Sequence, residues 1–148
     1  HNNVGINYLK DRIYYAAIQE FKIAIQLSPN TQATAIFKNN LGETYTFIGY
    51  PEMARVCFED AIKLYGLNFK YYQNLAECYR ILGITNTKMK ELANSKSPYD
   101  KIMLGLLQIQ AGQTRKGVIT LDDLCSSEPD LLITPAIRQY LREVTAKL

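Results

Sequence analysis

The clearest helical pattern in the chain covers residues 40–64. Leu41, Tyr45 and Ile48 recur at helical spacing and form one apolar stripe. Residues 49–51, Gly-Tyr-Pro, then interrupt the pattern, because glycine favours a helix C-terminus and proline favours the first turn of the next helix. A second apolar stripe follows at Ala54, Phe58, Ala61 and Ile62. The pattern therefore predicts two short helices folded back on each other.

The same pattern recurs before and after this hairpin. Gly5 stands 37 residues before Gly42 (42 − 5), and Tyr79 stands 34 residues after Tyr45 (79 − 45). A fourth copy carries small and apolar residues at related positions: Leu104, Gly105, Gly112, Gly117 and Leu121. A hairpin of this size cannot bury its own apolar faces, so it must stack on copies of itself. The repetition therefore predicts a helical repeat protein.

These repeats resemble the tetratricopeptide repeat family, whose pattern is an aromatic residue, Leu-Gly, Tyr, then Ala, Phe, Ala and a final Pro. The middle copy carries Leu41, Gly42, Tyr45, Ala54, Phe58 and Ala61. The first copy carries Gly5, Tyr8, Ala17, Phe21, Ala24 and Pro29. The resemblance covers nearly the whole chain. It implies an all-α fold, a right-handed α-solenoid of about four helical hairpins plus a C-terminal capping helix.

We expect one repeat domain over residues 1–148, with repeats at about 1–31, 32–68, 69–97 and 98–131. Extra residues between the first two copies predict a longer first helix in the second copy. The third copy is short after Gly83, and its second helix offers a weak apolar face. This joint is therefore expected to open most easily. Ser97 and Pro98 are expected to cap and begin the helix that follows.

A capping helix is predicted at about residues 134–147, with Thr134 as its N-cap and Pro135 in its first turn. Its apolar stripe is backed by polar residues, as is typical of a helix that closes a repeat stack. No such cap precedes the first repeat, because His1 falls inside the first expected helix. We therefore expect the chain to be a fragment of a longer repeat protein. Without the preceding repeats, Val4 and Tyr8 would be poorly covered.

Composition narrows the possible partners. The net charge of +3 is too small to indicate nucleic-acid binding, and no apolar run approaches the roughly 18 residues that a membrane helix needs, so no membrane insertion is expected. Cys57, Cys78 and Cys125 form no CxxC pair, which indicates small core residues rather than disulfides or a zinc site. Nothing in the sequence decides the cellular compartment.

Catalytic chemistry has little support in the sequence. The only histidine is His1, so no cysteine can be assigned a histidine base. The chain also lacks a phosphate-binding loop, a dinucleotide fingerprint and metal-spaced ligands. We therefore predict no catalytic residue, no metal ligand and no cofactor.

A row of amide side chains is the best candidate for function. Asn3, Asn40 and Asn74 occupy the same position in the first three copies. The resemblance implies that this part of each first helix faces the concave groove, where an amide offers both a donor and an acceptor to a peptide backbone. The predicted groove residues are Asn3, Asn39, Asn40, Glu43, Phe47, Lys70, Asn74, Glu77, Arg80 and Ile81. The alternative is that the asparagines bridge adjacent repeats or reflect recent duplication.

Some members of the family clamp the C-terminal carboxylate of heat-shock chaperones. Asn40 and Lys70 fall at positions similar to that clamp, but Asn2, Ile6 and Asn74 stand where other residue types are required. We therefore do not expect chaperone-tail binding.

The sequence as a whole predicts a non-catalytic module that binds a protein or an extended peptide in its groove. Two alternatives remain open. The chain could be the substrate-recruiting region of a larger enzyme, or a structural scaffold that self-associates through its exposed first repeat.

Overall fold

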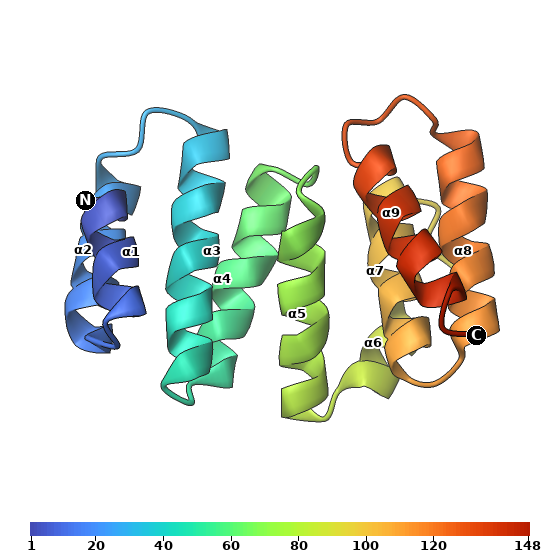
Figure 1. Cartoon of the computed structure of the whole chain (residues 1–148), viewed down its shortest axis with the longest axis horizontal. Coiled ribbons are helices and arrows are strands. Elements are labelled where there is room, and N and C mark those ends of the chain that lie inside the picture. The colour runs from blue at the N-terminus through green and yellow to red at the C-terminus, as the bar shows by residue number, and fades with distance from the viewer. The chain divides into compact units, whose positions relative to one another are not determined.

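The computed structural model describes all 148 residues, which form nine helices and no strand (Figure 1). The helices are α1 (Asn2–Lys10), α2 (Tyr14–Gln26), α3 (Thr31–Phe47), α4 (Pro51–Leu64), α5 (Phe69–Leu82), α6 (Thr85–Leu92), α7 (Pro98–Gln110), α8 (Thr114–Ser127) and α9 (Thr134–Thr145). Short turns join α1 to α2, α3 to α4, α5 to α6 and α7 to α8. The chain is therefore a series of helical hairpins followed by one further helix.

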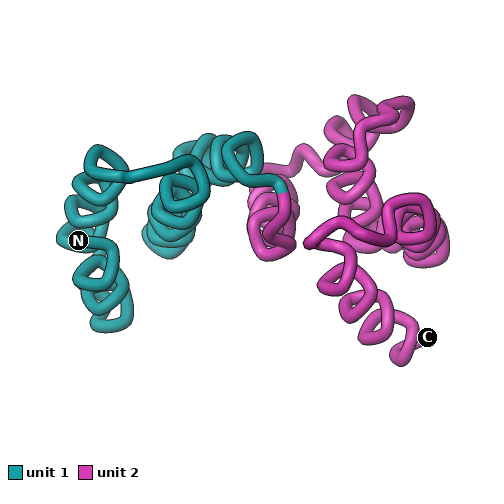
Figure 2. The backbone as a smooth tube through the Cα atoms, turned by 90° about the horizontal axis from the view of Figure 1, so that it is seen from above, with its two compact units in different colours: residues 1–66 teal, residues 67–148 magenta.

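The helices fall into two compact units, shown in teal and magenta in Figure 2. The first unit, His1–Gly66, holds α1 to α4, in which α1 packs on α2, α2 on α3 and α3 on α4. The second unit, Leu67–Leu148, holds α5 to α9, in which α7 packs on α8 and also meets α5 and α6, while α9 packs on α8. The expected repeat boundaries within one domain stay a prediction.

The turn between α3 and α4 has the form that the sequence predicts. Gly49 adopts a left-handed backbone with φ of 84°, and Pro51 occupies the first turn of α4. Gly83 and Gly112 take the same conformation after α5 and α7, with φ of 72° and 88°. Arg12 stands at the equivalent place in the first hairpin, with φ of 61°. Glycine suits three of these turns because it has no Cβ to clash in this conformation.

Each well-formed hairpin is held together by a glycine facing a large apolar side chain. A Cβ added to Gly42 would lie 2.6 Å from Cε1 of Phe58, a fully enclosed ring. Gly5 and Phe21 repeat this arrangement in the first hairpin, and Gly105 approaches a leucine side chain in the same way. The absent side chain lets the two helices approach closely, which explains the Gly and Phe positions of the repeat pattern.

The long first helix of the second copy and the short second helix of the third copy are both present, as the sequence predicts. α3 is the longest helix, with 17 residues, and Asn30 caps it by accepting a hydrogen bond from the Ala33 N–H at 2.8 Å. α6 has only 8 residues and contains no buried side chain. Its Lys88 ammonium lies 5.3 Å from the centre of the Tyr79 ring, within the range of a cation–π contact. The predicted weak third hairpin is therefore present.

Of two predicted helix caps, Ser97 stands at the N-cap of α7 with Pro98 as the first helical residue, whereas the cap predicted at Thr134 is wrong. Ser97 precedes α7 but makes no side-chain capping bond; instead Ser95 Oγ accepts from the Ser97 N–H at 3.2 Å and donates to Asp100 Oδ2 at 2.6 Å. Thr134 is the first residue of α9 rather than its N-cap, and its hydroxyl donates to the Glu128 carbonyl at 2.6 Å. At Thr134 a nearby loop carbonyl competes successfully for the hydroxyl.

Candidate functional site

In the first unit, three predicted groove residues form a stripe along α3. Asn40, Glu43 and Phe47 are spaced at i, i+3 and i+7, which places them on one face of the helix. Asn40 and Glu43 are half-buried, whereas Phe47 is 67% exposed. The stripe therefore combines an amide, a carboxylate and an accessible apolar side chain.

The second unit carries a matching stripe on α5, in which Asn74, Glu77 and Ile81 repeat the spacing. Ile81 is 46% exposed, and Lys70 and Arg80 are exposed beside the stripe. Arg80 Nε donates to Glu77 Oε2 at 2.9 Å, and this hydrogen bond lowers the pKa of the Glu77 carboxyl. Glu77 is therefore a carboxylate at neutral pH.

A pair of side-chain amides joins α1 to α3. Asn40 Nδ2 donates to Asn2 Oδ1 at 2.9 Å. This bond uses the Asn40 amide N–H and the Asn2 side-chain oxygen, so the Asn2 amide N–H and the Asn40 side-chain oxygen, Oδ1, lie outside it. Together the two residues offer one donor and one acceptor, which match the C=O and N–H of a peptide backbone. We refer to Asn2 and Asn40 as the amide pair.

The remaining predicted amides are placed differently. Asn3 is exposed on α1, and Asn2 rather than Asn3 is the residue that meets Asn40. Asn39 is only 7% exposed, so its side chain is largely closed to solvent. Within the first unit, the bond between Asn2 and Asn40 is also a structural bridge between neighbouring hairpins.

An aromatic pair lies at the C-terminal end of the α3 stripe. The rings of Tyr14 and Phe47 stack with their centroids 6.3 Å apart and their planes 16° apart. The stack joins the first residue of α2 to the last residue of α3, at the helix ends opposite the loop that connects them. Tyr14 was not among the predicted site residues. Its only signal in the sequence is the adjacent pair of tyrosines at positions 14 and 15.

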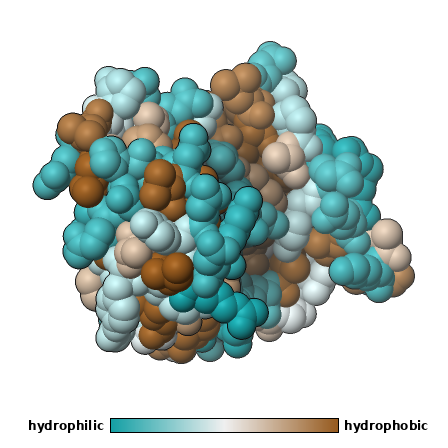
Figure 3. Space-filling view, turned by 60° about the vertical axis from the view of Figure 1, so that its left-hand side comes forward, coloured by the Kyte–Doolittle hydropathy of each residue, from teal (hydrophilic) through white to brown (hydrophobic).

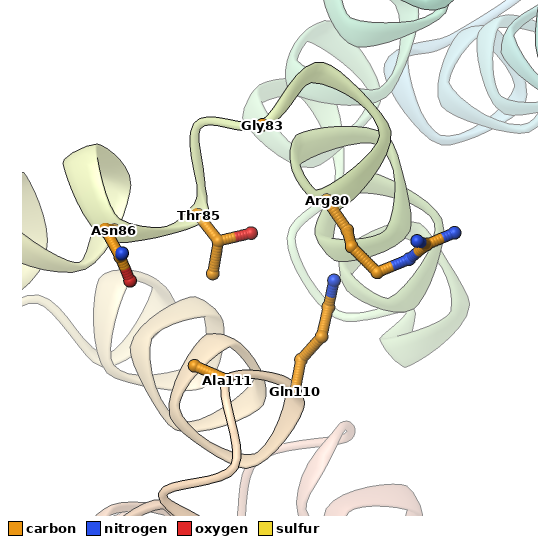
Figure 4. Close-up of a pocket in the computed structure, with 6 residues that line it drawn as sticks. All are labelled: Arg80, Gly83, Thr85, Asn86, Gln110 and Ala111. Carbon is orange, nitrogen blue, oxygen red and sulfur yellow. The ribbon is translucent and has the colours of Figure 1, made fainter.

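The second unit also contains a surface pocket of about 300 Å³ beside Arg80 (Figure 4). The aliphatic part of Arg80 and the amide of Gln110 face the Thr85 side chain across the opening. Gln110 Nε2 donates to the Ala76 carbonyl at 3.2 Å, which fixes one wall. The pocket is lined by Arg80, Gly83, Thr85, Asn86, Gln110 and Ala111. Only Arg80 among them was a predicted groove residue; Gly83 stood out in the sequence only as a helix-ending glycine of the repeat pattern.

The histidine and the cysteines belong to no metal site. The His1 imidazole bonds Glu20 at 2.6 Å, and no group of three or more His, Cys, Asp or Glu residues could hold a metal ion. Burial raises the pKa of the Cys57 thiol to about 11, so this cysteine is protonated at neutral pH. None of the helices has both the length and the apolar character needed to cross a bilayer.

Comparisons with known proteins agree with the helical-hairpin fold. The Tetratricopeptide repeat family model matches residues 36–66, which contain most of α3 and all of α4. One solved structure, described as a crystal structure of MamA, is 17% identical with a TM-score of 0.55 and covers 97% of this chain and 94% of that chain. A second MamA crystal structure is 18% identical with a TM-score of 0.56, at 98% and 86% coverage. No curated protein sequence matches.

The family match and the shared fold confirm the predicted class, an all-helical α-solenoid built from hairpins. Solenoids of this kind are protein-interaction modules, because stacked repeats present extended surfaces to partners. The central hairpin matches the family directly, and the glycine–aromatic packing of the first hairpin follows the same pattern. The chain therefore contains a match to the Tetratricopeptide repeat at residues 36–66, within an all-helical fold similar to that of MamA.

Proposed function

We propose that the chain binds an extended segment of a partner protein on the first helices of its hairpins and performs no catalysis. The amide pair carries this proposal. A buried or half-buried peptide group needs partners for both its N–H and its C=O, and the pair offers one of each. These contacts go to the partner's backbone, so they favour binding without strict dependence on its sequence.

The stack of Tyr14 and Phe47 supports a second contact in the first unit. Asn40 and Phe47 are separated by seven residues along α3, or about 10 Å at the helical rise. An extended chain advances about 3.3 Å per residue, so the partner's apolar side chain lies about three residues from the backbone contact. We expect that side chain to rest on the exposed Phe47 ring.

The α5 stripe is proposed as a further contact surface in the second unit. Asn74 can contact the partner's backbone and Lys70 favours acidic groups, while Glu77 and Arg80 neutralise each other in an ion pair. Ile81 supplies an apolar contact, as Phe47 does in the first unit. The pocket beside Arg80 can accept a polar side chain, because its walls carry a hydroxyl and two amides.

The test begins with a peptide selected from a random display library against residues 1–148. Its affinity is then measured for the wild type and for Asn40→Ala. Each lost hydrogen bond costs on the order of 1 kcal/mol, so we expect binding to weaken about fivefold. Phe47→Ala should weaken binding by a similar factor and should lower the selectivity for apolar side chains.

Gln19→Ala is the matched control, because Gln19 is an exposed amide on α2, away from the stripe. It should bind the peptide as the wild type does. Equal affinities for wild type, Asn40→Ala and Phe47→Ala would contradict the proposal. Thermal melts of every variant separate a loss of contact from a loss of fold.

Two alternatives make different predictions. In a larger enzyme the same surfaces would recruit the substrate, and the complete reading frame would then encode a catalytic domain. In a self-associating scaffold the first hairpin would be covered by a second copy; its Val4 is 45% exposed. On the face seen in Figure 3, however, hydrophobic areas alternate with hydrophilic ones. Sizing at several concentrations would reveal self-association.

A further inference from the structure

The shortness of α6 leaves one side of the next hairpin incompletely covered. The second helices of the other hairpins have 13 or 14 residues, whereas α6 has 8. After Leu92 the chain continues as a loop, residues 93–97, and not as helix. This loop lies beside α7 and α8, and a pocket of about 420 Å³ opens between the three segments. We call it the α7–α8 pocket.

The walls of this pocket are fixed by hydrogen bonds. Ser95 is held against α7 by its 2.6 Å bond to Asp100. On the other side, the Thr120 hydroxyl donates to Gln108 Oε1 at 2.7 Å. Leu104 and Leu124 contribute the apolar part of the lining. The pocket is lined by Ala93, Ser95, Lys101, Leu104, Thr120, Asp123, Leu124 and Ser127. Both the loop wall and the helix walls are therefore anchored within the second unit.

Two opposite charges line this pocket without neutralising each other. Lys101 comes from α7 and Asp123 from α8, and neither takes part in any of the ion pairs of the structure. Asp123 would repel a simple anion, and Lys101 would repel a simple cation. A ligand that carries both charges and an apolar group between them satisfies all three features.

We propose that the α7–α8 pocket binds an extended peptide segment in which an apolar side chain lies between an acidic and a basic one. The apolar side chain occupies the space over Leu104 and Leu124, the acidic one meets Lys101 and the basic one meets Asp123. The volume lies within the range of small binding sites. This site is separate from the α3 and α5 stripes and does not depend on the function proposed for them.

Two blocked pentapeptides test the proposal, with the central sequence Glu-Leu-Lys in one and Lys-Leu-Glu in the other. Each is titrated into ¹⁵N-labelled chain 1–148 and followed by amide chemical shifts. We expect one order to bind and to shift the Thr120 and Leu124 signals. A neutral Gln-Leu-Gln peptide and a Glu-Gly-Lys peptide without the apolar side chain should each bind about tenfold more weakly.

Charge reversal in the protein provides the sharper test. Lys101→Glu should weaken the preferred peptide about tenfold, and Lys101→Glu with Asp123→Lys should prefer the opposite peptide order. Lys116→Glu, an exposed change on α8 outside the pocket, is the control and should leave binding unchanged. The proposal is overturned if all peptides bind equally or if the amide chemical shifts change only outside the pocket. It is also overturned if those shifts depend on protein concentration without peptide.

Discussion

The contact between Gly42 and Phe58 predicts that Gly42→Ala destabilises the wild-type chain but stabilises the Phe58→Ala variant. A methyl group on Gly42 would lie 2.6 Å from Cε1, 2.9 Å from Cδ1 and 3.0 Å from Cζ of Phe58. The ring is only 2% exposed, so it has little room to move away. Gly42→Ala should therefore force the hairpin apart, even though alanine is the better helix former.

The magnitudes come from opposing terms. Overpacking lowers the free energy of unfolding by about 1–3 kcal/mol, and replacing a mid-helix glycine by alanine raises it by about 0.5–1 kcal/mol. Phe58→Ala alone should cost about 3–5 kcal/mol because it leaves a core cavity. In the Phe58→Ala protein the added methyl has space, so Gly42→Ala should there stabilise by about 0.5–1 kcal/mol. The two positions should thus be coupled by about 1–3 kcal/mol.

Urea unfolding of the four proteins, followed by far-ultraviolet circular dichroism, gives this coupling free energy. Gly49→Ala is the control: its left-handed backbone makes the substitution costly, but no atom lies within 4 Å of its added Cβ. Its cost should be the same with or without Phe58. If Gly42→Ala also has the same effect in both backgrounds, the close approach of α3 and α4 is not what the glycine provides.

Three further predictions concern single features. The amides of α6 should exchange hydrogen faster than those of α7, because α6 buries no side chain; equal protection would contradict this. Cys57 should react slowly with iodoacetamide at neutral pH, with a rate that rises until pH about 11; fast neutral alkylation would show that the thiol pKa is not raised. Thr134→Val should lower the free energy of urea unfolding by about 1 kcal/mol, because it removes the hydroxyl bond to the Glu128 carbonyl, whereas Thr134→Ser should keep it. Equal stability of the valine variant and the wild type would show that this bond contributes nothing.

Helix boundaries and hairpin packing were the predictable part of the structure. Gly49 and Pro51 are strong local signals, because their backbone preferences hold in almost any context. The Gly42–Phe58 contact follows from the repeat pattern, since one side chain must be absent where a large one enters. The weak α6 was also visible, because few apolar residues occur there.

The details of the candidate surface were less predictable. Neighbouring residues on a helix point about 100° apart, so whether Asn2 or Asn3 meets Asn40 depends on how α1 crosses α3. Sequence periodicity carries no information about that crossing. The cap at Thr134 failed for a similar reason: its hydroxyl has a competing partner that only the folded loop brings close.

The most direct test of the peptide-binding proposal is to follow the side-chain amide signals of Asn2 and Asn40 by NMR. A peptide selected against residues 1–148 is added to the ¹⁵N-labelled chain. The proposal predicts that both side-chain amides shift on saturation, together with backbone signals near Phe47. Binding that leaves these side-chain amides unchanged and shifts only α2 and α4 would contradict it.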